Sequence, residues 1–164
     1  MSIRVLPVLA ALSLTVWTAA GQTSAAPPQH PAPEIGIPDD PSSLLGLSPK
    51  AAWERFGAPD RILPVRGDEP WQDDIAFEYA RGYTFFWFRD YLWQIRLDER
   101  YSGSCLGIFP GDTPEKALSL LGSPERTSET YLEWRLPGKG YPIRLRLLTD
   151  GGAISEIYVY RSDF

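Results

Sequence analysis

The sequence predicts an α+β fold in which two tandem repeats each place a short helix on one face of a three- or four-stranded antiparallel sheet. The first observation is a stretch that occurs twice, at residues 48–61 and 113–126. In each copy a Ser or Thr precedes a Pro, and Gly-x-Pro follows about two turns later, a pattern typical of a capped helix. The second observation is that aromatic or aliphatic segments separated by turn residues follow each copy.

Four parts make up the expected domain organisation. Residues 1–26 are typical of an export signal, because Arg4 precedes an apolar run that small residues follow. The run is shorter than the roughly 20 apolar residues of a membrane-spanning helix, and an uncleaved anchor stays open as an alternative. Residues 27–43 are rich in Pro and predict a disordered leader. Residues 44–103 and 104–164 form the two expected repeats.

Each repeat begins with a helix whose start and end are marked by residue type. A hydroxyl side chain caps the start, a proline occupies the first turn, and a glycine ends the helix in a left-handed conformation. The apolar residues at 52, 53 and 56, and at 117, 118 and 121, are expected to cover the sheet. The cap, proline and glycine are Ser48, Pro49 and Gly57 in the first copy and Thr113, Pro114 and Gly122 in the second.

Runs rich in aromatic and β-branched residues predict the strands. Pro64 cannot donate a ladder hydrogen bond, so its strand is expected at a sheet edge. The acidic loop at 66–74 has no calcium-loop spacing and is expected to be solvated. The predicted strands are 61–65, 77–79, 83–88 and 92–97 in the first repeat, and 132–134, 143–148 and 154–159 in the second.

Alternation along the strands predicts which side chains face the helices. Ile143, Leu145 and Leu147 alternate with Arg144 and Arg146. Because successive strand residues point to opposite faces, the aliphatic side chains are expected to face the helices and the arginines to face away. The residues at 83, 85 and 87 are their expected counterparts in the first repeat, and Gln94 and Arg96 are expected to point outward.

The outer face would therefore carry aromatic and arginine side chains, which are enriched at protein–protein contacts. Two other interpretations stay open: the leader or the other repeat covers this face, or the aromatics reflect strand propensity alone. The predicted protein-binding face consists of Phe86, Phe88, Arg96, Tyr131, Arg144, Arg146, Tyr158 and Tyr160.

The sequence lacks the residues of the common catalytic and cofactor sites. The single histidine, His30, lies in the expected leader, which disfavours both a nucleophile with a histidine base and a zinc site. No glycine-rich phosphate loop follows a strand. The formal net charge is −5 without a basic stripe, which disfavours nucleic-acid binding. We therefore expect no catalytic, cofactor-binding or metal-binding residues.

Three residues leave alternatives open. Cys105 is the only cysteine, so it is either a small buried residue or a thiol that is reactive or pairs with another molecule. Glu78 and Glu133 are the repeat-related pair for a carboxylate hydrolase, which needs two acids at a suitable separation. The alternative for this pair is that both are solvent-facing strand residues.

The Leu-Gly-Leu-Ser-Pro start at 45–49, the short helix and the Gly-x-Pro-Asp at 57–60 resemble a known family. The pattern is similar to the small outer-membrane-assembly lipoproteins of the SmpA/OmlA type, and the tandem arrangement is similar to the β-lactamase inhibitory protein. The resemblance covers residues 45–159 and implies an exported protein that binds proteins through a concave, aromatic-rich sheet face. The lipobox cysteine and the inhibitor's disulfide cysteines are absent, so neither specific role is carried over.

Together these features predict an exported, non-enzymatic protein-binding module of the cell envelope or periplasm. The expected partner is an unidentified protein or envelope component. We expect no binding to nucleic acid, and attachment to a membrane only if the signal stays uncleaved. A monomer is expected. The alternatives are a structural or scaffolding component of the envelope and, third, the carboxylate hydrolase.

Overall fold

The computed structural model describes residues 36–68 and 73–163. The predicted signal, most of the predicted leader and part of the acidic loop lie outside these residues. Within them, neither α-helix is long or apolar enough to cross a membrane. In chain order the elements are η1 (Pro41–Leu44), α1 (Pro49–Phe56), β1 (Arg61–Val65), β2 (Asp74–Tyr79), β3 (Tyr83–Phe88), β4 (Tyr91–Leu97), α2 (Pro114–Leu121), β5 (Arg126–Thr127), β6 (Tyr131–Leu136), β7 (Ile143–Asp150) and β8 (Ala153–Arg161).

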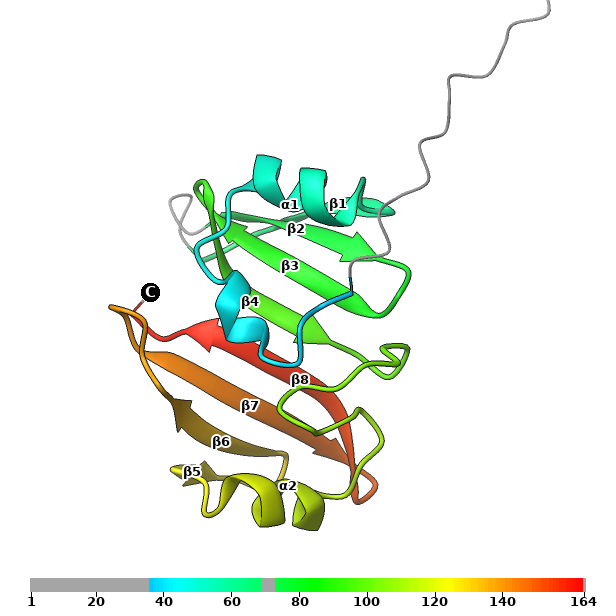
Figure 1. Cartoon of the computed structure of the whole chain (residues 1–164), viewed down its shortest axis with the longest axis vertical. Helices are drawn as coiled ribbons and strands as arrows, with labels where there is room; N and C mark the ends of the chain where they lie inside the picture. The colour runs from blue at the N-terminus through cyan, green and yellow to red at the C-terminus, as the bar shows by residue number, and fades with distance from the viewer. Residues whose placement is uncertain (1–35, 69–72, 164) are drawn as a thin grey trace, which may run out of the picture. The chain divides into compact units, whose positions relative to one another are not determined.

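All eight strands belong to one antiparallel sheet in the order β1-β2-β3-β4-β8-β7-β6-β5 (Figure 1). The prediction of two tandem helix-plus-sheet repeats is therefore wrong. The two groups of strands join where β4 pairs with β8, from Gln94 opposite Tyr160 to Leu97 opposite Ile157. Two separate sheets would leave the edges of β4 and β8 unpaired, whereas joining them satisfies their backbone N–H and C=O groups. The strand β1, which contains Pro64, lies at an edge as predicted.

Local capping explains where the two helices begin and end. The Ser48 hydroxyl accepts a hydrogen bond from the Ala51 amide at 3.3 Å, as an N-cap does. Thr113 stands at the start of α2, but its side chain makes no capping hydrogen bond. Gly57 and Gly122 end the helices with φ of 80° and 75°, and conformations with positive φ are easily reached only by glycine.

The helices lie on the inner face of the sheet, where the core forms. The Phe56 ring of α1 packs edge-on against Phe85 of β3, with 5.2 Å between ring centroids. Trp53 and Leu118 were expected in this contact, but they are 48% and 40% exposed. In α1 the residues that face the sheet are Ala52 and Phe56, which are four positions apart and share one helix face. Trp53 lies beside that stripe and points away from the core.

The segment before α1 also packs on the inner face. Residues 36–43 belong to the predicted leader, yet Ile37 is buried and η1 begins at Pro41. Farther along, the Gly46 amide donates to the Leu92 carbonyl at 2.8 Å, and the Leu92 amide donates to the Leu47 carbonyl at 2.9 Å. This segment therefore completes the hydrogen bonding of β4 beyond the reach of β8.

Cys105 is a buried core residue. It is fully inaccessible, and its backbone pairs with that of Ile108. Burial, followed by the nearby carboxylates of Asp39 and Asp40, raises the pKa of its thiol far above the ordinary value. The structure therefore favours the interpretation of Cys105 as a small apolar core residue.

Candidate functional site on the outer sheet face

The outer face is the side of the sheet opposite α1 and α2. Ile143, Leu145 and Leu147 are fully buried in the core, which confirms that Arg144 and Arg146 point away from the helices. Residues directly opposite each other on neighbouring strands form a row across the whole face. From β1 to β5 this row is Arg61, Glu78, Thr84, Arg96, Tyr158, Arg146, Glu133 and Arg126.

A buried carboxylate organises one half of this face. We call Glu133 with Arg126, Arg144, Arg146 and Tyr160 the Glu133 cluster. The Glu133 carboxylate accepts hydrogen bonds from Arg144 Nη1 at 3.1 Å, from Arg146 Nε at 2.8 Å and from the Tyr160 hydroxyl at 2.6 Å. Arg126 Nη1 lies 3.6 Å from the same carboxylate. Glu133 is completely buried beneath these side chains, so the expectation that it faces solvent is wrong.

The electrostatics of the cluster keep Glu133 charged. Burial alone would raise the pKa of Glu133, but the hydrogen bonds from Tyr160 and Arg146 and the charges of Arg146 and Arg144 outweigh it and lower that pKa. Burial, together with the hydrogen bond to Glu133, raises the pKa of Tyr160 to about 12. The cluster therefore combines a carboxylate, arginines and a protonated phenol at neutral pH.

Aromatic rings fix the position of Arg146. Its guanidinium carbon lies 4.7 Å from the centroid of the Tyr131 ring and 5.4 Å from that of Tyr160. Cation–π contacts of this kind add to the ion pair with Glu133. The side chain of Arg146 is nevertheless 36% exposed, so one edge of this ordered group stays open to the surroundings.

A hollow of about 350 Å³ lies where β4, β8 and β7 meet. We call it the seam hollow. Its lining combines aromatic, aliphatic and polar side chains from strands that are far apart in the sequence. The lining residues are Trp93, Gln94, Arg146, Leu148, Tyr158 and Tyr160.

A β-bulge turns Trp93 toward this hollow. Phe86 pairs with Gln94, but the next pair is Trp87 with Leu92, which leaves Trp93 as the extra residue. Bulges often redirect a side chain in this way. The Trp93 indole N–H donates to Asp74 Oδ2 at 2.8 Å. Trp93 is absent from the predicted binding face, although the apolar residues Leu92 and Ile95 are three positions apart, a spacing that breaks the two-residue period and signals a bulge.

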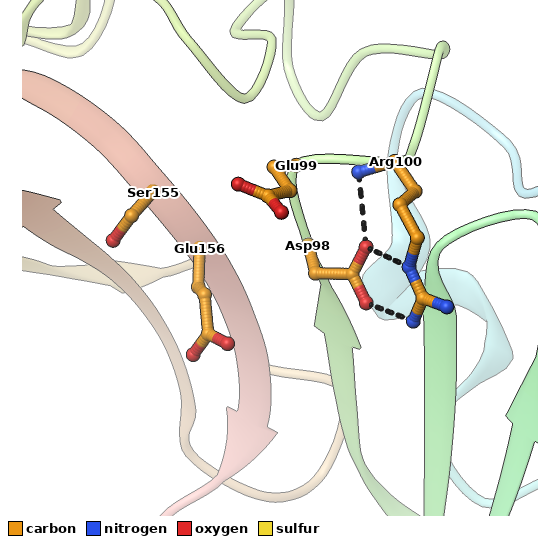
Figure 2. A pocket seen from close by; sticks show the side chains of 5 residues that line it. All are labelled: Asp98, Glu99, Arg100, Ser155 and Glu156. Atoms are coloured by element: carbon orange, nitrogen blue, oxygen red, sulfur yellow. Dashed lines mark hydrogen bonds and ion pairs between the residues drawn. The ribbon is translucent and has the colours of Figure 1, made fainter.

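A second ion-pair group lies at the end of β4 (Figure 2). Asp98 accepts hydrogen bonds from Arg100 Nε at 3.0 Å and Nη2 at 2.7 Å, and this bonding lowers the pKa of Asp98. Figure 2 shows the Asp98 carboxylate turned toward Arg100 and away from Glu156.

Among the residues that the structure describes, no three His, Cys, Asp or Glu side chains gather as a metal site requires.

The structure separates the eight residues of the predicted binding face into three groups. Arg146, Tyr158 and Tyr160 line the seam hollow, and Tyr131 and Arg144 support it through Arg146 and Glu133. The Arg96 guanidinium forms ion pairs with Asp98, through Nη2 and Oδ2 at 3.7 Å, and with Glu156, through Nη1 and Oε1 at 3.7 Å. Phe86 and Phe88 are half-buried on β3 and do not line the hollow. Gln94 and Leu148, which the predicted face omitted, do line it.

The paired carboxylates of the hydrolase hypothesis do not come together. Glu78 lies on β2 and Glu133 on β6, with β3, β4, β8 and β7 between them. Five strand-to-strand steps of about 4.8 Å place them about 24 Å apart. Glycosidases hold their two carboxyl groups within about 10 Å, so these two residues cannot act on one bond.

Comparison with known proteins finds a similar fold in solved structures. No family model matches this chain, and neither does any curated protein. An extracellular protein containing an SCP domain from Bacillus anthracis is similar in structure, with a TM-score of 0.54 and 9% sequence identity over 84% of this chain. A cysteine-rich secretory protein from Staphylococcus aureus gives a TM-score of 0.48 and 13% identity over 81% of this chain. The chain spans about half the length of each, 50% and 47%.

These findings correct the resemblance inferred from the sequence. The matched Bacillus structure is an extracellular protein containing an SCP domain, not an SmpA/OmlA lipoprotein or the β-lactamase inhibitory protein. The short capped-helix motif is the reason for the error, because such caps occur wherever a helix of this length begins and ends.

Proposed function

We propose that this chain is an exported, non-enzymatic protein-binding module that uses the outer face of its sheet. The observation that carries the proposal is the seam hollow beside the Glu133 cluster. Arg146 and Tyr160 belong to both, and both are held by the buried Glu133 carboxylate. Side chains that are already ordered lose little conformational entropy when a partner binds.

The chemical character of the hollow supports the same proposal. Tyrosine, tryptophan and arginine dominate the energetic centres of protein interfaces. The hollow combines all three types with Leu148. The phenol of Tyr158 also donates to Glu156 Oε2 at 2.6 Å, which fixes its ring. Residues of this type can bind a partner protein without catalysing a reaction.

A capture experiment tests the proposal. The full chain is immobilised and exposed to envelope extract and culture fluid from its own source, and the retained proteins are identified. We expect Tyr158→Ala to reduce retention of a specific partner at least about tenfold, as a hot-spot residue would. The matched control is Trp53→Ala, because Trp53 is 48% exposed and lies on α1, on the opposite side of the sheet. Equal retention by the wild type and the Tyr158→Ala chain would contradict the proposal.

The alternative of a scaffolding component that self-associates through edge strands has less support. The edge strand β1 contains Pro64, and the other edge, β5, has only two residues (Figure 1). Short edges and edge prolines hinder strand-to-strand association. We expect a monomer in sedimentation velocity, and growth of the sedimentation coefficient with concentration would favour the scaffold instead.

A further inference from the structure

One corner of the outer face carries a surplus of positive charge. We define the arginine corner as Arg126, Arg135, Arg144 and Arg146 with their neighbours Glu125 and Glu133. Four arginines meet two glutamates, a surplus of two, on a chain whose formal net charge is −5. A local charge opposite in sign to that of the whole chain favours an anionic partner at this place.

Arg135 carries the charge that the fold leaves uncompensated. It lies directly opposite Arg144 on β7, and like charges in such cross-strand pairs destabilise a sheet. Arg144 is bound by Glu125 at 3.0 Å and by Glu133 at 3.1 Å. Arg135 is exposed and forms no ion pair within residues 36–68 and 73–163. A carboxylate from another molecule would relieve the repulsion between the two arginines.

The register links Arg135 to the seam hollow. Arg135 pairs with Arg144, and Arg144 pairs with Tyr160, which lines the hollow. Two strand-to-strand steps of about 4.8 Å separate Arg135 from Tyr160 by about 10 Å. About three residues of an extended chain cover this distance. One short segment can therefore reach both places.

We propose that the arginine corner and the seam hollow together dock an acidic segment of a partner protein. A carboxylate of that segment pairs with Arg135, and an aromatic or aliphatic side chain enters the hollow. This inference rests on the proposed function and adds the chemical class of the partner. A nucleic acid fits less well, because duplex binding typically neutralises several phosphates and the surplus here is two charges.

Fluorescence anisotropy tests the inference with the full chain and a fluorescein-labelled peptide that repeats Glu, Phe and Ser. A matched peptide carries Gln in place of Glu. We expect the Glu peptide to bind at least about tenfold more tightly than the Gln peptide, and Arg135→Glu to remove this difference. The matched control, Arg81→Glu, makes the same charge change in the exposed turn between β2 and β3 and should leave binding unchanged.

Thermal unfolding separates lost binding from lost folding. Arg135→Glu replaces a like-charge pair with an opposite-charge pair, so its midpoint should equal or exceed that of the wild type. Equal binding of the two peptides, or equal effects of Arg135→Glu and Arg81→Glu, would overturn the acidic partner. The binding face itself would still be judged by its own capture experiment with Tyr158→Ala. Preference for a labelled oligodeoxythymidylate over the Glu peptide would also overturn this inference.

Discussion

Glu78 and Glu133 stand at comparable places in the two halves of the outer face, yet the structure holds them differently. Each lies on the strand next to a sheet edge, and each meets an arginine of the edge strand. Arg61 lies 3.3 Å from Glu78, and Arg126 lies 3.6 Å from Glu133. The Glu78 side chain keeps 16% of its surface exposed, whereas Glu133 is completely covered.

The residue opposite each glutamate on the next strand accounts for the difference. Glu78 faces Thr84, and Glu133 faces Arg146. Glu78 therefore finds its second cation in Arg100, from the loop after β4, at 3.4 Å. Glu133 finds its cations and a phenol on the sheet itself. The comparison teaches that the residue opposite a carboxylate on the next strand decides whether its cations come from a loop, as for Glu78, or from the sheet itself, as for Glu133.

The largest expected effect is the loss of stability when Glu133 is removed, compared with the loss when Glu78 is removed. Glu133→Ala should lower the free energy of unfolding by about 2–4 kcal/mol, because it leaves Arg144 and Arg146 without their shared partner. Glu78→Ala should cost less than about 1 kcal/mol, because its partners Arg61 and Arg100 are 64% and 47% exposed and can be solvated without it. Urea denaturation of both variants measures the difference. Equal losses would mean that the burial of Glu133 makes no difference to stability.

Protonation of Glu133 at acidic pH should lower the free energy of unfolding by less than Glu133→Ala does, because protonation removes the charge but keeps the side chain. The pKa of Glu133 is lowered in the folded state from its ordinary value of 4.5. Its stabilising contribution is therefore complete above that value and is lost as the pH falls through the folded pKa. The stability difference between wild type and Glu133→Gln should narrow between neutral and acidic pH. A constant difference across this range would contradict the lowered pKa.

A smaller effect is expected from the phenol that donates to Glu133. Tyr160→Phe keeps the ring against Arg146 and removes one hydrogen bond, so the free energy of unfolding should fall by about 1 kcal/mol. Tyr131→Phe is the matched control, because the Tyr131 ring also lies against Arg146. Chemical denaturation compares the two. A loss for Tyr131→Phe as large as that for Tyr160→Phe would show that the bond to Glu133 adds nothing.

The smallest effect is expected at the two edge arginines, where the halves are most alike. The side chains of Arg61 and Arg126 are 64% and 59% exposed. Alanine at either position should change the free energy of unfolding by less than about 0.5 kcal/mol, because solvent and salt screen exposed pairs. Thermal unfolding of both variants at low and high salt measures the change in stability and its screening by salt. A markedly larger loss for Arg126→Ala than for Arg61→Ala would show that the contact of Arg126 with the buried Glu133 carboxylate is worth more than an exposed ion pair.

The sequence by itself determined the local features of this protein. Pro49 and Gly57, with Pro114 and Gly122, bounded the helices because caps act within one turn. Alternation placed Arg144 and Arg146 on the outer face because side-chain direction depends only on the neighbouring residues of the same strand. Pro64 marked an edge strand for an equally local reason, its missing N–H group.

The tertiary structure alone decided which strands meet. Joining β4 to β8 brings Gln94 beside Tyr160, and this pairing creates the seam hollow and merges two expected sheets into one. The burial of Glu133 likewise depends on side chains from β7 and β8. Strand pairing is a contact between residues distant in the chain, and no local pattern of residues records it. The sequence therefore determined which side chains point to the outer face, and the tertiary structure determined which of them form the seam hollow and the Glu133 cluster.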